Sequence, residues 1–113
     1  MNKNKETHDL GSDPSLLLVD DDEPVVRRLS RAMEKRGFEV RSALTVTDGK
    51  KLVESLPPGY AVIDLRLEDG SGLEVVELIR EKRPDARIIV LTGYGAIATA
   101  VTAVKMGATD YLS

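Results

Sequence analysis

The chain has 113 residues, of which 42% are hydrophobic and 31% charged, and its formal net charge is −3. This length supports one hydrophobic core and excludes a tandem-domain protein. With no cysteine and a single histidine, the composition also excludes disulfides, cysteine- or histidine-rich metal centres and Ser-His-Asp catalysis.

The acidic charge balance and the low aromatic content, 4%, argue against direct nucleic-acid binding. The longest apolar runs contain four residues, whereas a membrane span needs about 20. The first 14 residues are polar and have no signal-peptide pattern. We therefore expect a soluble cytoplasmic domain over residues 15–113, preceded by a disordered N-terminal tail over residues 1–14.

From residue 16 on, short apolar runs alternate with segments of helical spacing. The apolar run 16–19 predicts a strand buried on both faces, because it is too short for a helix and ends at acidic residues. A proline suited to a first turn, apolar spacing and a following glycine predict a helix over residues 24–36. The alternation that begins at Phe38 predicts a second strand near a sheet edge.

The second half of the chain continues this alternation. A capping box at Thr45 and Asp48 predicts a short helix that ends before Pro57. The remaining predicted elements are a strand over 60–63, a helix between a loop at 69–72 and Pro84, a strand over 88–91, a helix over 96–106 and a strand from 110 to 113. This order predicts an α/β fold with a doubly wound five-stranded parallel sheet and helices on both faces.

Polar side chains follow three of the predicted strands at their carboxyl ends, where a sheet of this kind binds its ligand. Asp20, Asp21 and Asp22 follow the first strand, Asp64 follows the strand 60–63, and Thr92 follows the strand 88–91. If these strands are neighbours, their carboxylates crowd together and titrate as a coupled set unless a cation joins them. Because Mg²⁺ prefers carboxylate, carbonyl and water ligands, the sequence predicts a magnesium site here. Asp64 is the candidate nucleophile that would form an acyl phosphate.

Each acidic residue taken alone also fits a structural role, because an acid after a strand often caps the next helix or starts a turn. Asp22 favours this interpretation, since it stands directly before Glu23 and Pro24. Thr92 alone is equally well explained as a good strand former. The functional interpretation depends on the acids occurring together at the ends of different strands.

These motifs together resemble the receiver domain of two-component response regulators. The residues that carry the resemblance are LLVDDD at 17–22, IDLRL at 63–67, DGSGL at 69–73, VLTG at 90–93 and GATDYL at 107–112. Residues 64–72 and 91–101 are similar in particular to the redox-responding RegA, PrrA and ActR regulators. The resemblance implies a flavodoxin-like receiver that lacks its last helix, since the family's Lys-Pro would begin at the residue after Ser113.

The resemblance also implies roles for the residues of the site. Asp64 would accept a phosphoryl group from the phosphohistidine of a sensor histidine kinase. Asp21 would bind Mg²⁺ directly, Asp20 would bind it through a water molecule, and the backbone carbonyl of Arg66 would be a further ligand. Thr92 would bind the phosphoryl group.

Tyr111 would act as a switch residue that turns inward when the phosphorylated site tightens. DNA would be contacted only through a C-terminal domain that this chain lacks, and no membrane partner is implied. The chain departs from the family at Arg66 and Glu68, which replace residues that are more often Asn or Asp and Pro, and at Gly93. Without the last helix, an apolar sheet face is expected to promote a homodimer or a segment-exchanged oligomer.

Two other functions stay open on the residues alone. One is an aspartate-nucleophile phosphatase of the haloacid-dehalogenase type, although residues 20–24 lack the Thr or Val expected two places after the second acid. The other is an assembly module that is not phosphorylated. If the chain is a receiver domain, we do not expect it to be an enzyme. Such a domain catalyses only its own phosphorylation and dephosphorylation.

Overall fold

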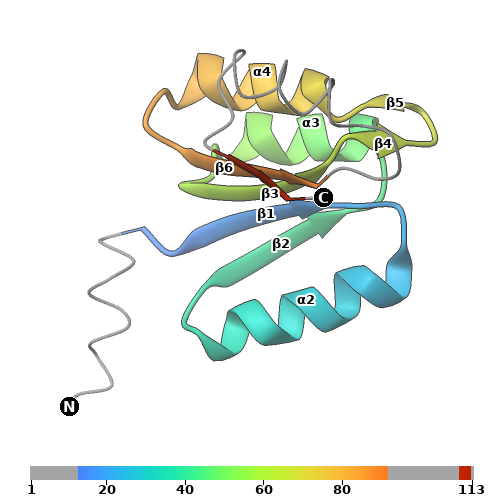
Figure 1. Cartoon of the computed structure of the whole chain (residues 1–113). Coiled ribbons are helices and arrows are strands. Elements are labelled where there is room, and N and C mark those ends of the chain that lie inside the picture. Colours follow the sequence, from blue (N-terminus) through green and yellow to red (C-terminus); the bar gives the residue numbers. More distant parts are fainter. Residues whose placement is uncertain (1–12, 92–109, 113) are drawn as a thin grey trace.

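The computed structural model describes residues 13–91 and 110–112. Its centre is a parallel sheet with the strand order β2-β1-β3-β6-β7 (Figure 1). The strands are β1 (Ser15–Val19), β2 (Glu39–Ala43), β3 (Tyr60–Asp64), β6 (Arg87–Leu91) and β7 (Asp110–Leu112). The doubly wound parallel sheet predicted from the sequence is confirmed, and the helix expected over 96–106 lies outside the described residues.

Helices cover both faces of this sheet. The helix α2 (Glu23–Lys35) lies on one face, and α3 (Val46–Ser55) and α4 (Leu73–Lys82) lie side by side on the other (Figure 1). The helices begin and end close to the positions that the apolar spacing predicts. Within residues 13–91 and 110–112, no helix has the length and apolar character needed to cross a membrane.

The starts of α2 and α3 are set by side-chain caps. Asp22 accepts a hydrogen bond from the Val25 N–H at 3.2 Å, and the Thr45 hydroxyl accepts one from the Asp48 N–H at 3.0 Å. Each cap satisfies an N–H group that has no partner inside its helix. The structural role that the sequence favours for Asp22 is therefore confirmed.

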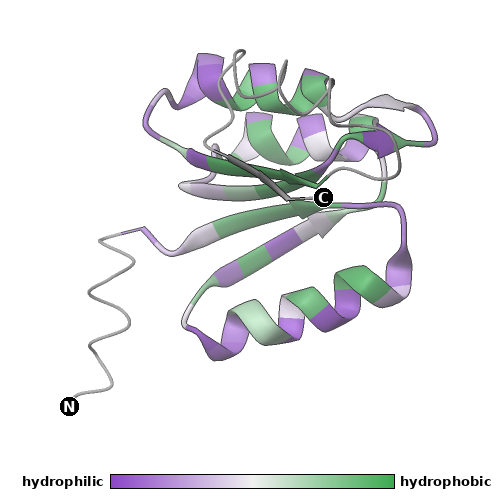
Figure 2. Ribbon diagram, in the orientation of Figure 1, coloured by the Kyte–Doolittle hydropathy of each residue, from purple (hydrophilic) through white to green (hydrophobic). Residues whose placement is uncertain are grey.

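The larger of two hydrophobic clusters fills the space between the sheet and the α3–α4 pair, where Figure 2 shows the apolar colour concentrated. Its fully buried side chains include Ile63 and Ile88 from the strands and Val53 and Ile79 from the helices. A smaller cluster lies under α2. The strand β1 supplies both clusters with alternate side chains, and all five of its residues are buried, which confirms the prediction of a strand buried on both faces.

A short hairpin follows β3 where the sequence predicts only a loop over 69–72. The strands β4 (Arg66–Leu67) and β5 (Gly70–Ser71) pair in antiparallel fashion, with Arg66 opposite Ser71 and Leu67 opposite Gly70. The prediction of a plain loop is wrong for residues 70 and 71. A strand of two residues has no periodicity, so no alternation of apolar and polar residues could indicate it.

Asp13 and Pro14, which the sequence assigns to the N-terminal tail, make specific contacts with the sheet and with Arg83, the residue after α4. Asp13 accepts a hydrogen bond from the Ser15 N–H at 2.9 Å and forms an ion pair with Arg83. The Pro14 carbonyl accepts a hydrogen bond from the Glu39 N–H at 3.0 Å. The hydrogen bond from Arg83 lowers the pKa of Asp13 to about 2. These contacts hold the chain in place just before β1.

The packing predicts that Ile79→Ala destabilises the protein strongly. Ile79 is fully buried between α4 and the sheet, so truncation removes apolar contacts and leaves a cavity that costs about 2–5 kcal/mol. Urea unfolding followed by circular dichroism measures the loss. Glu77→Ala, at an exposed position of the same helix, is the control and should change stability by less than about 0.5 kcal/mol. Similar losses in both variants would contradict this description of the core.

Candidate functional site

Three carboxylates meet at the carboxyl edge of the sheet. The strands β1 and β3 are parallel neighbours with Val19 opposite Ile63, so the next residues, Asp20 after β1 and Asp64 at the end of β3, lie side by side. Asp20, Asp21 and Asp64 each offer a carboxylate oxygen, and these oxygens lie within 4.8 Å of one another. The structure therefore brings together three of the acids that the sequence singles out.

The three carboxylates differ in their exposure to solvent. Asp20 is 6% exposed, and its Oδ1 accepts a hydrogen bond from the Asp22 N–H at 2.9 Å. Asp64 is half-buried, whereas Asp21 is exposed. The cluster is thus closed toward the core and open toward solvent on the side of Asp21.

Burial and like charge make Asp64 hard to ionise. Burial is the largest cause that raises the pKa of Asp64 to about 6, and the neighbouring charges of Asp20 and Asp21 add to it. A hydrogen bond from the Arg66 N–H to Asp64 Oδ1, at 3.0 Å, acts in the opposite direction. A cation placed among the three acids would stabilise the ionised form of Asp64.

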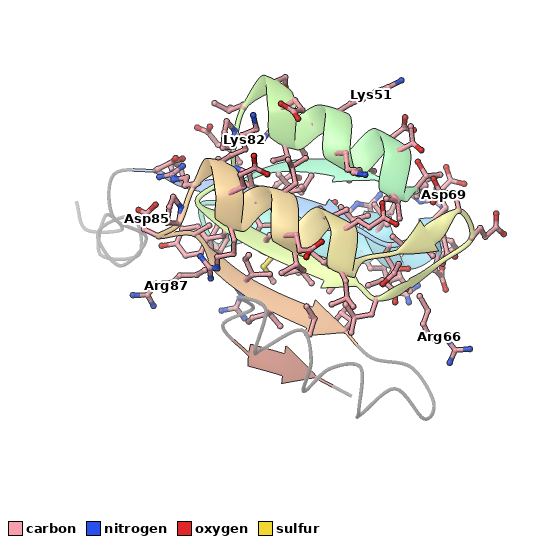
Figure 3. The ribbon with its side chains drawn as sticks, turned by 90° about the horizontal axis from the view of Figure 1, so that it is seen from above. Lys51, Arg66, Asp69, Lys82, Asp85 and Arg87 are labelled. Carbon is pink, nitrogen blue, oxygen red and sulfur yellow. The ribbon has the colours of Figure 1, made fainter. Side chains whose placement is uncertain are left out.

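Arg66 contacts the site through its backbone. Its N–H bonds to Asp64, while its side chain is exposed and points away from the protein (Figure 3). A cationic residue is compatible with the site at this position because its guanidinium group lies outward. This position is one of the departures from the family pattern named from the sequence, and the outward side chain is compatible with the backbone role that the resemblance implies for Arg66.

Gly72 permits a close approach of the chain to Asp64. A Cβ atom at this position would lie 2.2 Å from the Asp64 carbonyl oxygen and 2.9 Å from the Ile63 Cγ2 atom. The Gly72 N–H also donates to the Leu65 carbonyl at 3.1 Å. A side chain here would displace the backbone that carries Asp64, so glycine is required by space and not by an unusual dihedral angle.

Asp69 is a further functional candidate, although its sequence motif indicates no individual role for it. It lies at the tip of the β4–β5 hairpin, next to the first turn of α3 (Figure 3). Its carboxylate accepts hydrogen bonds from the Val46 N–H at 2.8 Å, the Thr47 N–H at 3.1 Å and the Thr47 hydroxyl at 3.0 Å. The two backbone bonds are the main cause that lowers the pKa of Asp69. An Asp-Gly pair in the sequence signals a turn, but its partner lies 22 or 23 residues away and could not be read from that signal.

For Tyr111 and Thr92, the other two predicted site residues, the structure gives less information. Tyr111 lies in β7, where the register pairs it with Val90 of β6. Thr92 lies outside the described residues. In the sequence it directly follows Leu91, which is opposite Asp64 in the β3–β6 pairing. Their roles at the site stay predictions.

The sequence model of the response regulator receiver domain family matches residues 16–113 of the chain. The chain belongs to this family. The receiver interpretation is therefore confirmed over the two alternatives, a haloacid-dehalogenase-type phosphatase and an assembly module that is not phosphorylated.

Relatives of this receiver domain include named regulators. It is 69% identical over 109 residues to the photosynthetic apparatus regulatory protein RegA of Rhodovulum sulfidophilum, covering 96% of this chain and 60% of that protein. It is 62% identical over 104 residues to the acid tolerance regulatory protein ActR of Rhizobium meliloti, covering 92% of this chain and 54% of that protein. The chain thus spans only a little over half the length of these relatives.

Solved structures show the same fold. A response regulator from Burkholderia pseudomallei, described as having a phosphorylated aspartic acid, a calcium ion and citrate, superposes with a TM-score of 0.81 at 43% identity. That match covers 87% of this receiver domain and 58% of the other chain. The beryllofluoride-activated NtrC4 receiver domain dimer superposes with a TM-score of 0.79 at 35% identity, covering 88% of this chain and 82% of the other.

The environment of Asp64 predicts that Asp64→Asn stabilises the metal-free protein at neutral pH. The unfolded chain gives Asp64 its ordinary pKa of 3.8, while the folded protein raises it to about 6. The wild type therefore loses stability as pH rises through this range, because the folded state must give up a proton that it holds more tightly. Asn carries no such charge and can still accept the Arg66 hydrogen bond.

Above pH 6 the variant should be more stable by about 1 kcal/mol, below the roughly 3 kcal/mol of the full shift because solvent screens a half-exposed carboxylate. The difference should vanish as the pH falls toward the ordinary pKa of aspartate. Urea unfolding in the presence of a chelator measures it, with Asp85→Asn, at an exposed side chain, as the matched control. A difference that is the same at every pH would show that the Asp64 charge is not its source.

Proposed function

We propose that Asp64 accepts a phosphoryl group from the phosphohistidine of a sensor histidine kinase, with Mg²⁺ held in the acidic cluster. The observation that carries this proposal is the convergence of Asp20, Asp21 and Asp64 within 4.8 Å in a receiver domain. The raised pKa of Asp64 supports it, since the cluster gains most from a cation at that carboxylate.

The donor set fits a hard divalent cation. Carboxylate oxygens and a backbone carbonyl are ligands that Mg²⁺ prefers, with water molecules in the remaining positions. Asp21 and Asp64 would bind the ion directly, Asp20 would act through a water molecule, and Arg66 would contribute its carbonyl oxygen. The calcium ion named for the Burkholderia pseudomallei regulator belongs to the same class of oxygen-binding cations.

In the transfer step, an oxygen of Asp64 attacks the phosphorus atom of the donor. A bond between that oxygen and phosphorus forms while the bond from phosphorus to the imidazole nitrogen breaks, and the nitrogen keeps the electron pair and takes a proton. When bound, the metal ion supplies positive charge that offsets the charge of the phosphoryl oxygens. The protein itself contributes position and hydrogen bonds, so it catalyses its own phosphorylation and, with water, its dephosphorylation, without turning over another substrate.

The acyl phosphate would act as a switch. It places a dianion where the apo site already holds three acids, and the surrounding loops respond by repacking. Thr92 would donate a hydrogen bond to a phosphoryl oxygen, and Tyr111 would change its side-chain rotamer. Thr92 directly follows β6 in the sequence, and Tyr111 lies within β7, the strand next to it.

The output would lie outside this chain. The relatives RegA and ActR are named regulatory proteins and are longer than this chain, so we propose that the receiver controls transcription through a C-terminal DNA-binding domain. Phosphotransfer from a histidine kinase would then take place in the cytoplasm.

Phosphorylation is the direct test. Incubation with Mg²⁺ and acetyl phosphate, which releases acetate as the leaving group, should add one phosphoryl group as measured by intact-protein mass spectrometry. Asp64→Asn should abolish the product because the nucleophilic oxygen is gone, and Asp21→Ala should abolish Mg²⁺ binding measured by calorimetry. Asp85→Asn, which changes an exposed acid, is the control and should react as the wild type does. A phosphoryl group that persists in Asp64→Asn would contradict the proposed acceptor.

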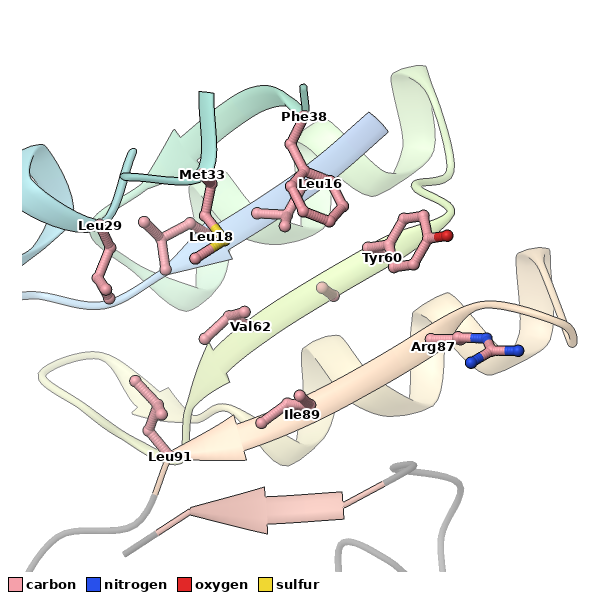
Figure 4. Close-up of a pocket in the computed structure, with 11 residues that line it drawn as sticks. Leu16, Leu18, Leu29, Met33, Phe38, Tyr60, Val62, Arg87, Ile89 and Leu91 are labelled. Carbon is pink, nitrogen blue, oxygen red and sulfur yellow. The ribbon is translucent and has the colours of Figure 1, made fainter. Parts of the chain in front are cut away.

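Self-association is proposed as a secondary property of the chain. Of the described helices, only α2 lies on its face of the sheet, and beside it a hollow of about 430 Å³ is lined mainly by apolar side chains (Figure 4). Leu18, Val62 and Ile89 from three adjacent strands form its floor, and Leu29 and Met33 of α2 form one wall. A second copy that covers this hollow, either face to face or by segment exchange, would remove the apolar surface from water.

The sedimentation coefficient of the chain should therefore rise with protein concentration. Met33→Glu, which puts a charge into the hollow, should weaken the association by about tenfold or more, because an unpaired charge at an apolar interface is strongly unfavourable. Ala32→Glu introduces the same charge at an exposed position of the same helix and should leave the association unchanged. Sedimentation that does not depend on concentration in the wild type would contradict this proposal.

A further inference from the structure

The β4–β5 hairpin connects the acidic site with the start of α3. At its tip, the Asp69 carboxylate accepts three hydrogen bonds, two from backbone N–H groups of Val46 and Thr47 and one from the Thr47 hydroxyl, at 2.8 to 3.1 Å. A negative charge at this place also interacts favourably with the helix dipole. The tip of the hairpin is thereby fixed to a helix that belongs to a different part of the chain.

The base of the same hairpin is fixed to the site. The Arg66 N–H donates to Asp64 Oδ1 at 3.0 Å, and the Gly72 N–H donates to the Leu65 carbonyl at 3.1 Å. Between base and tip, the two strands pair at only two positions, and Leu67 alone buries its side chain in the core. A hairpin this short is not stable by itself, so its conformation depends on these attachments.

We propose that Asp69 is a positioning residue of the metal site, which by fixing the hairpin to α3 holds the backbone of Arg66 against Asp64. This inference rests on the proposed function, in which the Arg66 carbonyl is a ligand of the ion. When the attachment is lost, the hairpin samples other conformations, and metal binding must first order it again, which lowers the affinity. Linkage requires the reverse effect as well: Mg²⁺ bound at Asp64 stabilises the first turn of α3.

Asp69→Ala and Thr45→Ala form a matched pair for the test. Both remove a side chain that caps α3, because Thr45 accepts a hydrogen bond from the Asp48 N–H, but only Asp69 connects the helix to the hairpin. Hydrogen exchange of the metal-free protein, measured at the amides of residues 46, 47 and 66, reports the attachment without any bound ion. Calorimetric titration with Mg²⁺ alone reports the affinity. Asp69→Asn, which keeps the shape of the side chain without its charge, provides a second variant for the same measurements if Asp69→Ala does not fold.

The expected result is that Asp69→Ala speeds exchange at Arg66 as well as at Val46 and Thr47, and weakens Mg²⁺ binding by about tenfold, the usual effect of losing a partner that orients a metal ligand. For Asp69→Asn, the exchange rates and the Mg²⁺ affinity should lie between those of the wild type and those of Asp69→Ala. Thr45→Ala should speed exchange only in α3 and leave the Mg²⁺ affinity unchanged. Mg²⁺ should also slow exchange at Val46 and Thr47 in the wild type and not in Asp69→Ala.

Equal effects of Asp69→Ala and Thr45→Ala on the Mg²⁺ affinity would overturn the inference, since Asp69 would then be only a helix cap. Unchanged exchange at Arg66 in both Asp69 variants would overturn it too. In either case the proposed function stands as long as the wild type binds Mg²⁺ and is phosphorylated. A wild type that does not bind Mg²⁺ would reject the proposed metal site and this inference together.

Discussion

The parallel pairing of β1 with β3 is the constraint on which the rest of the structure depends. Val19 lies opposite Ile63 in this pair, so the acids after both strands are forced into one small volume at the sheet edge. Burial of the strands provides the free energy that holds the acids together, because every residue of β1 is buried. Burial of the Asp64 carboxyl and, to a lesser degree, the like charges of Asp20 and Asp21 oppose ionisation in this arrangement, and together they raise the pKa of Asp64 to about 6. Hydrophobic burial thus creates a cluster of carboxylates that a bound cation would stabilise.

The backbone around Asp64 is held from three directions. The β3 strand carries it, Gly72 passes so close that no side chain fits between the two segments, and the Arg66 N–H bonds to its carboxylate. The hairpin between these residues extends to α3, where Asp69 caps the helix. The hairpin thus connects Asp64 with the first turn of α3, through the Arg66 N–H at its base and the Asp69 carboxylate at its tip.

The two faces of the sheet differ in the way they are covered. The face under α3 and α4 holds the larger cluster, whose central side chains are fully buried. On the face of α2, the described residues leave an apolar hollow over three strands. The edge that carries the acids is formed by β1 and β3, which are neighbours inside the sheet. The proposed site and the proposed association therefore use different parts of the same strands, namely the strand ends and the face under α2.

Much of this protein is determined by its sequence alone. The apolar runs and helical spacings predict the strands and the described helices closely, because burial on two faces and helix caps leave local patterns that can be read within a few residues. Asp20, Asp21 and Asp64 could be named for the same reason, since the first two come after one buried run and Asp64 ends another. Three features were decided only by tertiary structure: the outward direction of the Arg66 side chain, the contacts of Asp13 and Pro14, and the attachment of Asp69 to α3. Each depends on groups far apart in the chain, such as Asp69 and Val46, and a contact across that separation exists only once the sheet has brought both segments to one edge.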